Sequence, residues 1–234
     1  MVPLDLLLAG APEHRSRKGR PLVTLSYAQS LDGCIAARAG ERLALSGPES
    51  LQLTHRLRAM HDAILVGIGT LLADDPRLTV RLAPGRDPQP VVLDSHLRIP
   101  LEASLLQNSR PPWLACLETS ATGKATELAR LGALLLPVPP DSAGRVSIPA
   151  LLERLAQLGI NSLMVEGGAR VISAFLQQNR VDRVVLTVAP LFLGGLRAVG
   201  QDLFTARSYP RLQEMGVEQL GNDLILWGSL DSSV

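Results

Sequence analysis

Short apolar runs rich in β-branched residues recur along the chain and alternate with segments whose apolar positions follow a helical period. The runs predict strands at 22–27, 63–66, 90–93, 113–117, 133–136, 162–165, 183–188 and 223–227. The segments between them predict helices at 48–60, 121–131, 148–158 and 169–179. Continuous apolar strands that alternate with helices favour a mostly parallel sheet covered by helices on both faces.

Local signals support two of these helices. Ser46 and Glu49 stand three residues apart, the spacing of a capping box, and Pro48 occupies a first-turn position where a missing N–H costs little. Gly159 follows the third helix, and a glycine there is typical of a helix stop in the left-handed conformation.

The last ~50 residues follow a different pattern. Apolar runs at 184–189, 217–219 and 223–227 follow one another without a long helix, and Gly221-Asn222 is a turn signal between the last two. We therefore expect antiparallel strands at the C-terminal end of the sheet. The organisation predicts a flexible, basic leader at 1–19 that is solvated rather than bound to nucleic acid, one domain at 20–230, and a tail at 231–234.

Composition narrows the class of protein. The 234 residues carry a formal charge of +1, and aromatic residues make up 3%, so nothing suggests a nucleic-acid partner. Cys34 and Cys116 have no metal-ligand spacing, which argues against structural zinc. The apolar runs are far shorter than the ~20 residues of a membrane helix, and we expect a cytoplasmic protein without a membrane partner.

Two predicted strand-to-helix junctions contain glycines. The first, Val66–Thr70, resembles the start of a GxGxxG dinucleotide motif, but Leu72 stands at the third glycine position and Asp94 is further along than the expected acid. Two other interpretations remain open: glycines that permit close backbone approach beside Thr70 and Asp74, or a plain tight turn.

The second junction is residues 163–170 (LMVEGGAR). Its strand places Glu166 at a carboxyl end, and Gly167 and Gly168 then open a helix whose free N–H groups can bind phosphate. The alternative is a helix start with Glu166 as a partner of the helix dipole.

Other candidate chemistry is less specific. Arg58, Arg77 and Arg81 flank the first junction, and arginine suits bidentate phosphate binding, although single exposed arginines are usually only solvated. The histidines form no metal motif, and each is expected to be a surface or capping residue: His14, His55, His61 and His96. The sequence also contains neither a GxSxG elbow nor a P-loop.

Four blocks then occur in a specific order: 25–33 (LSYAQSLDG), 62–81 (DAILVGIGTLLADDPRLTVR), 91–100 (VVLDSHLRIP) and 165–170 (VEGGAR). With these blocks, the chain resembles the pyrimidine reductases of riboflavin biosynthesis over nearly its whole length. The resemblance implies a dihydrofolate-reductase-like, three-layer α/β fold and a homodimer. It also implies NADPH as hydride donor and a phosphosugar pyrimidine as substrate, a ribosylaminopyrimidine 5′-phosphate that is reduced to the ribityl compound.

The resemblance further assigns site residues. Positions that match the cofactor-binding residues of the family are Ala28, Thr70, Asp74, Ser95, Gly167, Gly168, Ala169 and Arg170. Positions that match its substrate-binding residues are Ser26, Arg58, Leu78, Arg81 and Glu166, and the two arginines are expected to clamp the phosphate. Asp32 belongs to a hallmark turn for which we expect a structural role. No catalytic residue and no metal are assigned, and water or the substrate is left to deliver the proton.

Three departures from the family bear on the substrate. Ser26 stands where bifunctional bacterial relatives often have lysine, Ala44 stands where an aromatic residue is common, and Arg42 stands where a serine often contacts substrate. They leave open whether the pyrimidine is deaminated or still diamino. A pterin or folate reductase is the first rival, which Arg58 and Arg81 disfavour. A non-catalytic nucleotide-binding module is the second rival.

Overall fold

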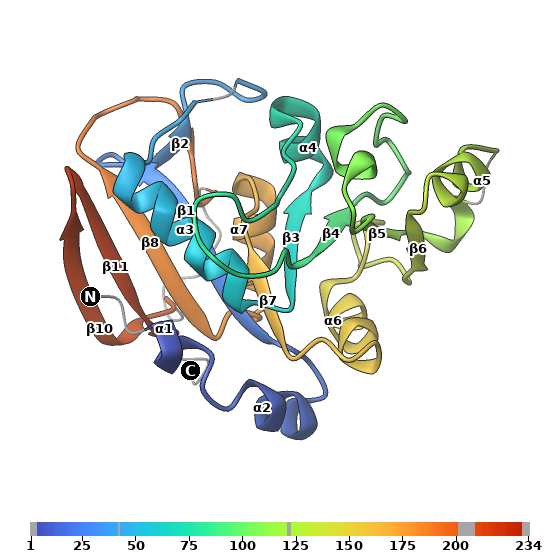
Figure 1. Cartoon of the computed structure of the whole chain (residues 1–234), viewed down its shortest axis with the longest axis horizontal. Coiled ribbons are helices and arrows are strands. Elements are labelled where there is room, and N and C mark those ends of the chain that lie inside the picture. The colour runs from blue at the N-terminus through green and yellow to red at the C-terminus, as the bar shows by residue number, and fades with distance from the viewer. Residues whose placement is uncertain (1–3, 42, 121–122, 201–208, 231–234) are drawn as a thin grey trace.

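A twisted sheet runs through the middle of the molecule (Figure 1). The computed structural model describes residues 4–41, 43–120, 123–200 and 209–230. Within those ranges the sheet has nine strands in the order β10-β11-β8-β1-β7-β3-β4-β5-β6. The strands from β8 to β6 are parallel, and β11 and β10 are antiparallel at one edge, which confirms the expected topology. Their bounds are β1 (Leu22–Ser30), β3 (Ala63–Gly67), β4 (Gln89–Leu93), β5 (Trp113–Cys116), β6 (Leu134–Pro137), β7 (Ser162–Val165), β8 (Arg183–Ala189), β10 (Leu212–Leu220) and β11 (Asp223–Leu230).

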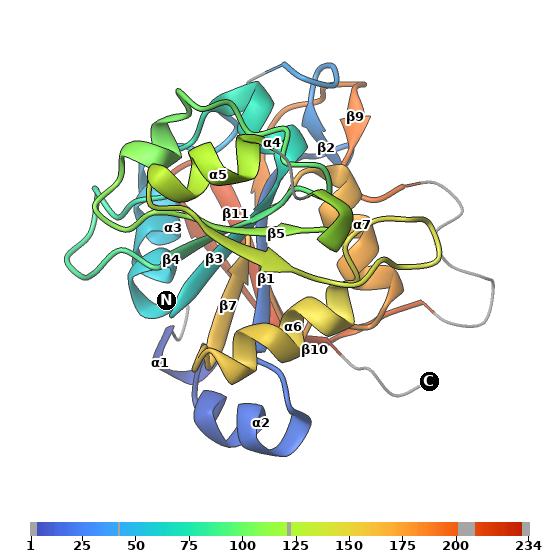
Figure 2. The same ribbon diagram turned by 90° about the vertical axis from the view of Figure 1, so that its right-hand side faces the viewer.

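Helices cover both faces of the sheet and make three layers (Figures 1 and 2). One face carries α3 (Pro48–Met60), α4 (Ile68–Asp74) and α5 (Gly123–Arg130), and the other carries α6 (Ile148–Gln157) and α7 (Ala169–Gln177). Two short 3₁₀ helices, Ser104–Gln107 and Glu118–Ser120, lie in the loops around β5. The predicted helix at 121–131 is found as α5, and residues 121–122 lie outside the described ranges.

The core follows from the alternation of side chains along each strand. On the α7 face, Leu25 and Val165 pair across β1 and β7 and pack with Phe175 of α7. On the α3 face, Met164 packs with Leu57 of α3. All five side chains are at most 1% exposed, so the central strands are buried on both faces, as their continuous apolar runs predict.

The N-terminus of α3 differs from the expected capping box. Its N-cap residue is Gly47 rather than Ser46, and no side chain of the cap residue closes the helix. Instead, the Gly47 N–H donates to Oδ2 of Asp223, the first residue of β11, at 2.8 Å. Pro48 at the first helical position is confirmed, as are the left-handed stop at Gly159 (φ 88°) and the Gly221-Asn222 turn between β10 and β11.

The described part of the predicted leader, residues 4–19, packs against the domain. It forms two short helices, α1 (Leu4–Leu7) and α2 (Ala11–Lys18), with Leu7 buried against α3 and Ala11 buried as well. Arg20 then makes two hydrogen bonds to Asp182, of 2.6 and 2.7 Å. Burial would raise the pKa of Asp182, but the Arg20 hydrogen bonds and charge outweigh it and hold the pKa below its usual value. Apolar contacts therefore join the described part of the leader to α3, and the ion pair joins the first residue after the leader to Asp182.

A second, two-stranded sheet was not predicted. It pairs β2 (Cys34–Ala36) with β9 (Leu196–Arg197), antiparallel, beside the carboxyl end of β1. These strands are too short to produce a periodic signal. In the described ranges, no helix is long and apolar enough to cross a membrane.

Candidate active site

The carboxyl ends of the parallel strands gather most of the predicted site residues at one edge of the sheet, next to α4 and β2 at the top of Figure 1. β7 lies between β1 and β3, so Glu166, which follows β7, is flanked by the ends of both neighbours. The Glu166 N–H donates to the Leu65 carbonyl of β3 at 2.9 Å. In open α/β sheets this edge is where ligands bind.

The two glycine junctions meet at this edge. A Cβ on Gly67 would lie 2.7 Å from Val171 of α7, and a Cβ on Gly167 would lie 2.4 Å from the same side chain. A Cβ on Gly168 would lie 3.1 Å from Oγ1 of Thr70. Both junctions therefore need glycine so that the strand ends and α7 can approach closely, which supports the close-approach interpretation.

The start of α7 fits a phosphate group. Gly168 is its N-cap residue, and no side chain caps it within the described part of the chain. Its first N–H groups point away from the helix without intrahelical partners, as at any helix start. Arg170 in the first turn is exposed. Backbone donors and a cation beside a glycine-lined surface suit the phosphates of a nicotinamide cofactor.

Thr70 and Asp74 lie one helical turn apart on α4, so their side chains share a face of that helix. Ser95 follows β4 by two residues, and its Oγ accepts the Val146 N–H at 3.1 Å. Ala28 is half-buried near the end of β1. All these predicted cofactor positions lie on the carboxyl side of their strands. Among the described residues, no group of His, Cys, Asp and Glu could hold a metal ion.

Arg58 and Glu166 form a two-pronged ion pair between α3 and the end of β7. Arg58 Nε donates to Glu166 Oε1 at 2.7 Å, and Arg58 Nη2 donates to Oε2 at 2.6 Å. The two side chains are 11% and 15% exposed. Burial would lower the pKa of Arg58, but the charge of Glu166 and its hydrogen bonds raise it.

The ion pair modifies the expected phosphate clamp. Arg58 Nη1 donates to the Thr79 carbonyl at 3.2 Å, so the guanidinium of Arg58 already bonds both the Glu166 carboxylate and the 78–81 segment. A guanidinium buried at this depth needs a counter-charge, and Glu166 supplies it. Of the two predicted clamp residues, Arg81 is the exposed one, and its Nη1 donates to the neutral hydroxyl of Thr79 at 2.7 Å.

The segment 78–81, which we call the 78–81 strap, carries two predicted substrate positions. Leu78 is 2% exposed and adopts φ 56°, a left-handed conformation that a branched side chain rarely takes. Such strain persists only where surrounding contacts hold it, and it gathers at functional sites. Ser26, the remaining substrate position, is 7% exposed on β1, on the same face as Thr24 and α3.

Asp32 has the structural role that was expected of it. Its Oδ1 accepts the Leu193 N–H at 3.0 Å and its Oδ2 accepts the Gly194 N–H at 2.6 Å. The Ser30 hydroxyl also donates to Oδ1, at 2.5 Å. These hydrogen bonds, that of Ser30 first, lower the pKa of Asp32 far below its usual value. The carboxylate therefore ties the turn after β1 to the loop after β8.

The histidines are partly corrected. His55 and His61 are 1% and 0% exposed, so neither is a surface residue. The ring of His61 bonds the Leu57 carbonyl at 2.7 Å, which is a capping contact in the last turn of α3, and the Thr24 hydroxyl at 2.9 Å. Burial lowers the pKa of His61 to about 4. His96 is exposed, as expected. Arg42 lies outside the described residues.

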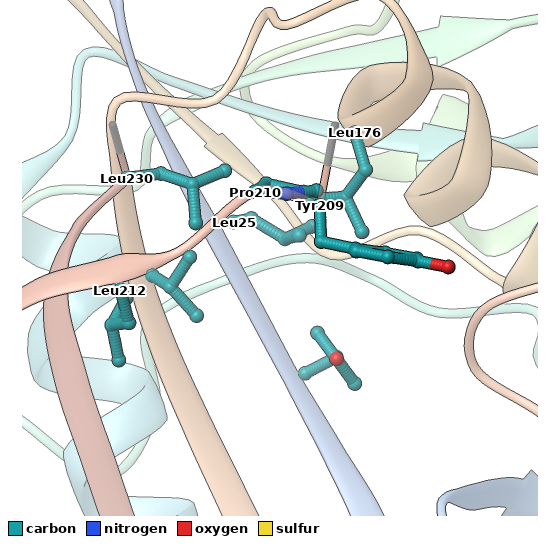
Figure 3. A pocket seen from close by; sticks show the side chains of 8 residues that line it. Leu25, Leu176, Tyr209, Pro210, Leu212 and Leu230 are labelled. Atoms are coloured by element: carbon teal, nitrogen blue, oxygen red, sulfur yellow. The ribbon is translucent and has the colours of Figure 1, made fainter. Parts of the chain in front are cut away.

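An apolar hollow of about 290 Å³ lies elsewhere, on the α7 face of the sheet. Leu25, Leu176 and Tyr209 converge on it from β1, α7 and the segment before β10 (Figure 3). None of the predicted site residues lines it. The hollow is therefore a feature separate from the candidate active site.

Comparison with known proteins supports one assignment of this site. The family model of the RibD C-terminal domain matches residues 21–226. A protein of Archaeoglobus fulgidus named 2,5-diamino-6-ribosylamino-4(3H)-pyrimidinone 5′-phosphate reductase is 40% identical over 75% of this chain and 83% of its own length. The reductase of the same name from Methanothermobacter thermautotrophicus is 37% identical over 88% of this chain and 97% of its own length.

Solved structures agree with the sequence comparisons. The RibD structure of Acinetobacter baumannii superposes with a TM-score of 0.82 and 31% identity, over 94% of this chain and 60% of that protein. The chain thus spans little more than half the length of such a RibD protein. A dihydrofolate reductase of Enterococcus faecalis has a TM-score of 0.53 and 14% identity, which shows a shared fold alone.

Proposed function

Since this chain belongs to the RibD C-terminal domain family, we propose that it reduces a ribosylaminopyrimidine 5′-phosphate to the ribityl compound, with NADPH as hydride donor. The observation that carries the proposal is the meeting of two glycine junctions and the Arg58–Glu166 pair at one sheet edge. The site offers donors for a cofactor phosphate next to a carboxylate that can accept hydrogen bonds from a second ligand.

Each part of the site has a role in this reaction. Bound NADPH would supply hydride to C1′ of the ring-opened ribose, whose C=N bond also takes up one proton, so the C1′–N bond is kept in the product. The backbone at 167–170 holds the cofactor phosphates, and Thr70 and Asp74 orient the cofactor from α4. Arg81 binds the 5′-phosphate of the substrate. Water or the substrate itself is the proposed proton donor.

Glu166 and Arg58 act as a unit on the pyrimidine side. The carboxylate accepts hydrogen bonds from hydroxyl or amino groups of the substrate, and Arg58 keeps it ionised and in place. Ser26 and Leu78, both buried, are the remaining proposed substrate positions. The diamino pyrimidine is the proposed substrate, because the names of the two archaeal relatives specify it.

The proposed function is tested by following the absorbance of NADPH in the presence of the purified protein. We expect oxidation with the diamino pyrimidine phosphate, slower oxidation with the deaminated one and none with dihydrofolate, because only the pyrimidines carry a phosphate for Arg81. The same assay with NADH tests the cofactor preference. Tight NADPH binding without oxidation by either pyrimidine would instead support a non-catalytic nucleotide-binding module.

We also propose a homodimer formed through the antiparallel edge of the sheet. Four paired residues form one row across β1, β8, β11 and β10, in that order: Tyr27, Leu186, Leu226 and Val217. The row starts at the apolar hollow and ends at Val217, which is 53% exposed. A continuous apolar surface on a sheet face is typical of an interface between subunits.

The proposal also includes a reducing, cytoplasmic location, which is supported by the free thiols of Cys34 and Cys116.

Replacing Val217 with aspartate is expected to convert the dimer to a monomer, because a buried charge without a partner is costly at an apolar interface. Light scattering during gel filtration measures the mass directly. Leu134→Asp, at a comparably exposed apolar position (44%) on the opposite edge strand β6, is the control and should leave the mass unchanged. A dimer that survives Val217→Asp would place the interface elsewhere.

A further inference from the structure

His55 is a buried histidine that the proposed reaction does not use. It lies in the middle of α3, is 1% exposed and precedes Arg58 by three residues, so both side chains leave the same face of the helix. Its Nδ1 accepts a hydrogen bond from the Arg81 N–H at 3.0 Å. The contact joins a helix of the core to the residue that is proposed to bind the substrate phosphate.

Three hydrogen bonds hold two consecutive peptide groups of the 78–81 strap, 79–80 and 80–81. Arg58 Nη1 bonds the Thr79 carbonyl at 3.2 Å, Asp87 Oδ1 accepts the Val80 N–H at 2.7 Å, and His55 accepts the Arg81 N–H. The strap begins at the left-handed Leu78. Fixed peptide groups on the C-terminal side of a strained residue are what keep such a conformation in place.

The contact requires a neutral imidazole. Because the Arg81 N–H is a donor, Nδ1 must present its lone pair and the ring proton must be on Nε2. Burial, first, and then the charges of Arg58 and Arg81 lower the pKa of His55 below 6.5, against the opposing charges of Glu166 and Asp87. The ring is therefore neutral at neutral pH, and it gains a second N–H only in acid.

We propose that His55 is a positioning residue of the reductase, whose Nδ1 lone pair fixes the Arg81 peptide group and so directs the Arg81 side chain to the substrate phosphate. The inference rests on the proposed function, since it assigns Arg81 to that phosphate. The inference adds a group that does not itself touch the substrate: an uncharged hydrogen-bond acceptor on α3 behind Arg81.

Two variants separate positioning from folding. His55→Asn keeps an acceptor oxygen near the place of Nδ1 but does not titrate, and His55→Leu keeps the bulk but removes the acceptor. We expect His55→Leu to raise KM for the pyrimidine by roughly tenfold or more with kcat within about threefold, because a lost binding contact acts on affinity. His55→Asn should keep KM within about threefold of the wild-type value.

The pH dependence of KM distinguishes a positioning role of His55 from a purely structural one, because a structural role would not make KM depend on the protonation of His55. As pH falls below about 6.5, the usual pKa of histidine, and His55 becomes protonated, wild-type KM should rise, because the protonated ring has a donor at each nitrogen and repels the Arg81 N–H. The His55→Asn profile should lack that rise. The substrate phosphate also titrates near pH ~6, but its effect is common to both proteins and cancels in the comparison. His61 stays neutral until the pH approaches its own pKa of about 4.

Equal KM in the wild-type protein and His55→Leu, or an acid rise that persists in His55→Asn, would overturn the proposal. If His55→Leu fails to fold, the pH comparison with His55→Asn decides alone. Amide hydrogen exchange of Arg81 tests the contact without turnover: protection should be lost in His55→Leu and kept in His55→Asn. A protein that oxidises no NADPH but shows this exchange pattern would refute the proposed function and leave the contact established.

Discussion

Replacing Glu166 with alanine is expected to reduce kcat/KM for the pyrimidine at least ~100-fold while the affinity for NADPH changes less than about tenfold (~1.4 kcal/mol). The carboxylate lies on the α3 face and is paired with Arg58, whereas the proposed cofactor contacts are the backbone of the following residues. The change removes a substrate acceptor and leaves the cofactor cradle intact. Steady-state kinetics and titration of NADPH fluorescence measure the two effects separately.

Stability must be separated from function in this experiment. Glu166→Ala leaves Arg58 buried without its counter-charge, which we expect to lower the free energy of unfolding by up to about 3 kcal/mol. The double variant Glu166→Ala/Arg58→Leu removes the unpaired charge, so it should recover stability but not turnover. Glu153→Ala, at an exposed position on α6, is the surface control. A loss of NADPH affinity well beyond tenfold would place Glu166 in the cofactor pocket.

The second large effect is expected at Gly167. A Cβ there would lie 2.4 Å from Cβ of Val171 and 2.5 Å from its Cγ1, so Gly167→Ala must push α7 away from the sheet. We expect a loss of roughly 2–3 kcal/mol in the free energy of unfolding, typical of overpacking, and at least ~10-fold weaker NADPH binding as the start of α7 moves. Denaturant unfolding and cofactor titration measure both.

Matched variants make the steric argument specific. Gly69 lies at the neighbouring junction, but a Cβ there would meet nothing within 4 Å, so Gly69→Ala should keep full stability. Gly167→Ala combined with Val171→Ala removes the clashing Cγ atoms and should recover part of the loss. If the double variant is no more stable than Gly167→Ala, the glycine is required for a reason other than the approach of Val171.

Periodicity predicted the regular part of this fold. The buried strand at 162–165 and the helix at 48–60 are found at their expected bounds, because burial on both faces and an amphipathic face both leave a local pattern. The strands β2 and β9 were missed because two or three residues carry no period. The Gly47–Asp223 cap was missed because its partners are 176 residues apart.

The candidate site divides in the same way. Gly167 and Gly168 could be identified locally, since a glycine pair at a strand-to-helix junction has a physical meaning on its own. Glu166 and Arg58 could each be named, but their pairing over 108 residues could not. Sequence therefore predicted two separate substrate contacts where the fold makes one charge-neutral unit. The buried acceptor role of His55 depends on the backbone of Arg81 and leaves no trace in residue spacing.

The position of β1 at the centre of the sheet has a consequence for the order of folding. β3, β4, β5 and β6 are neighbours in both sequence and space, so this half of the sheet can assemble as the chain leaves the ribosome. β1, although made early, pairs with β7 and β8, which are synthesised more than 130 residues later. The apolar surface of β1 therefore lacks its strand partners during most of synthesis. Chaperone protection is expected to matter most until β1 pairs with β7 and β8 and closes the centre of the sheet.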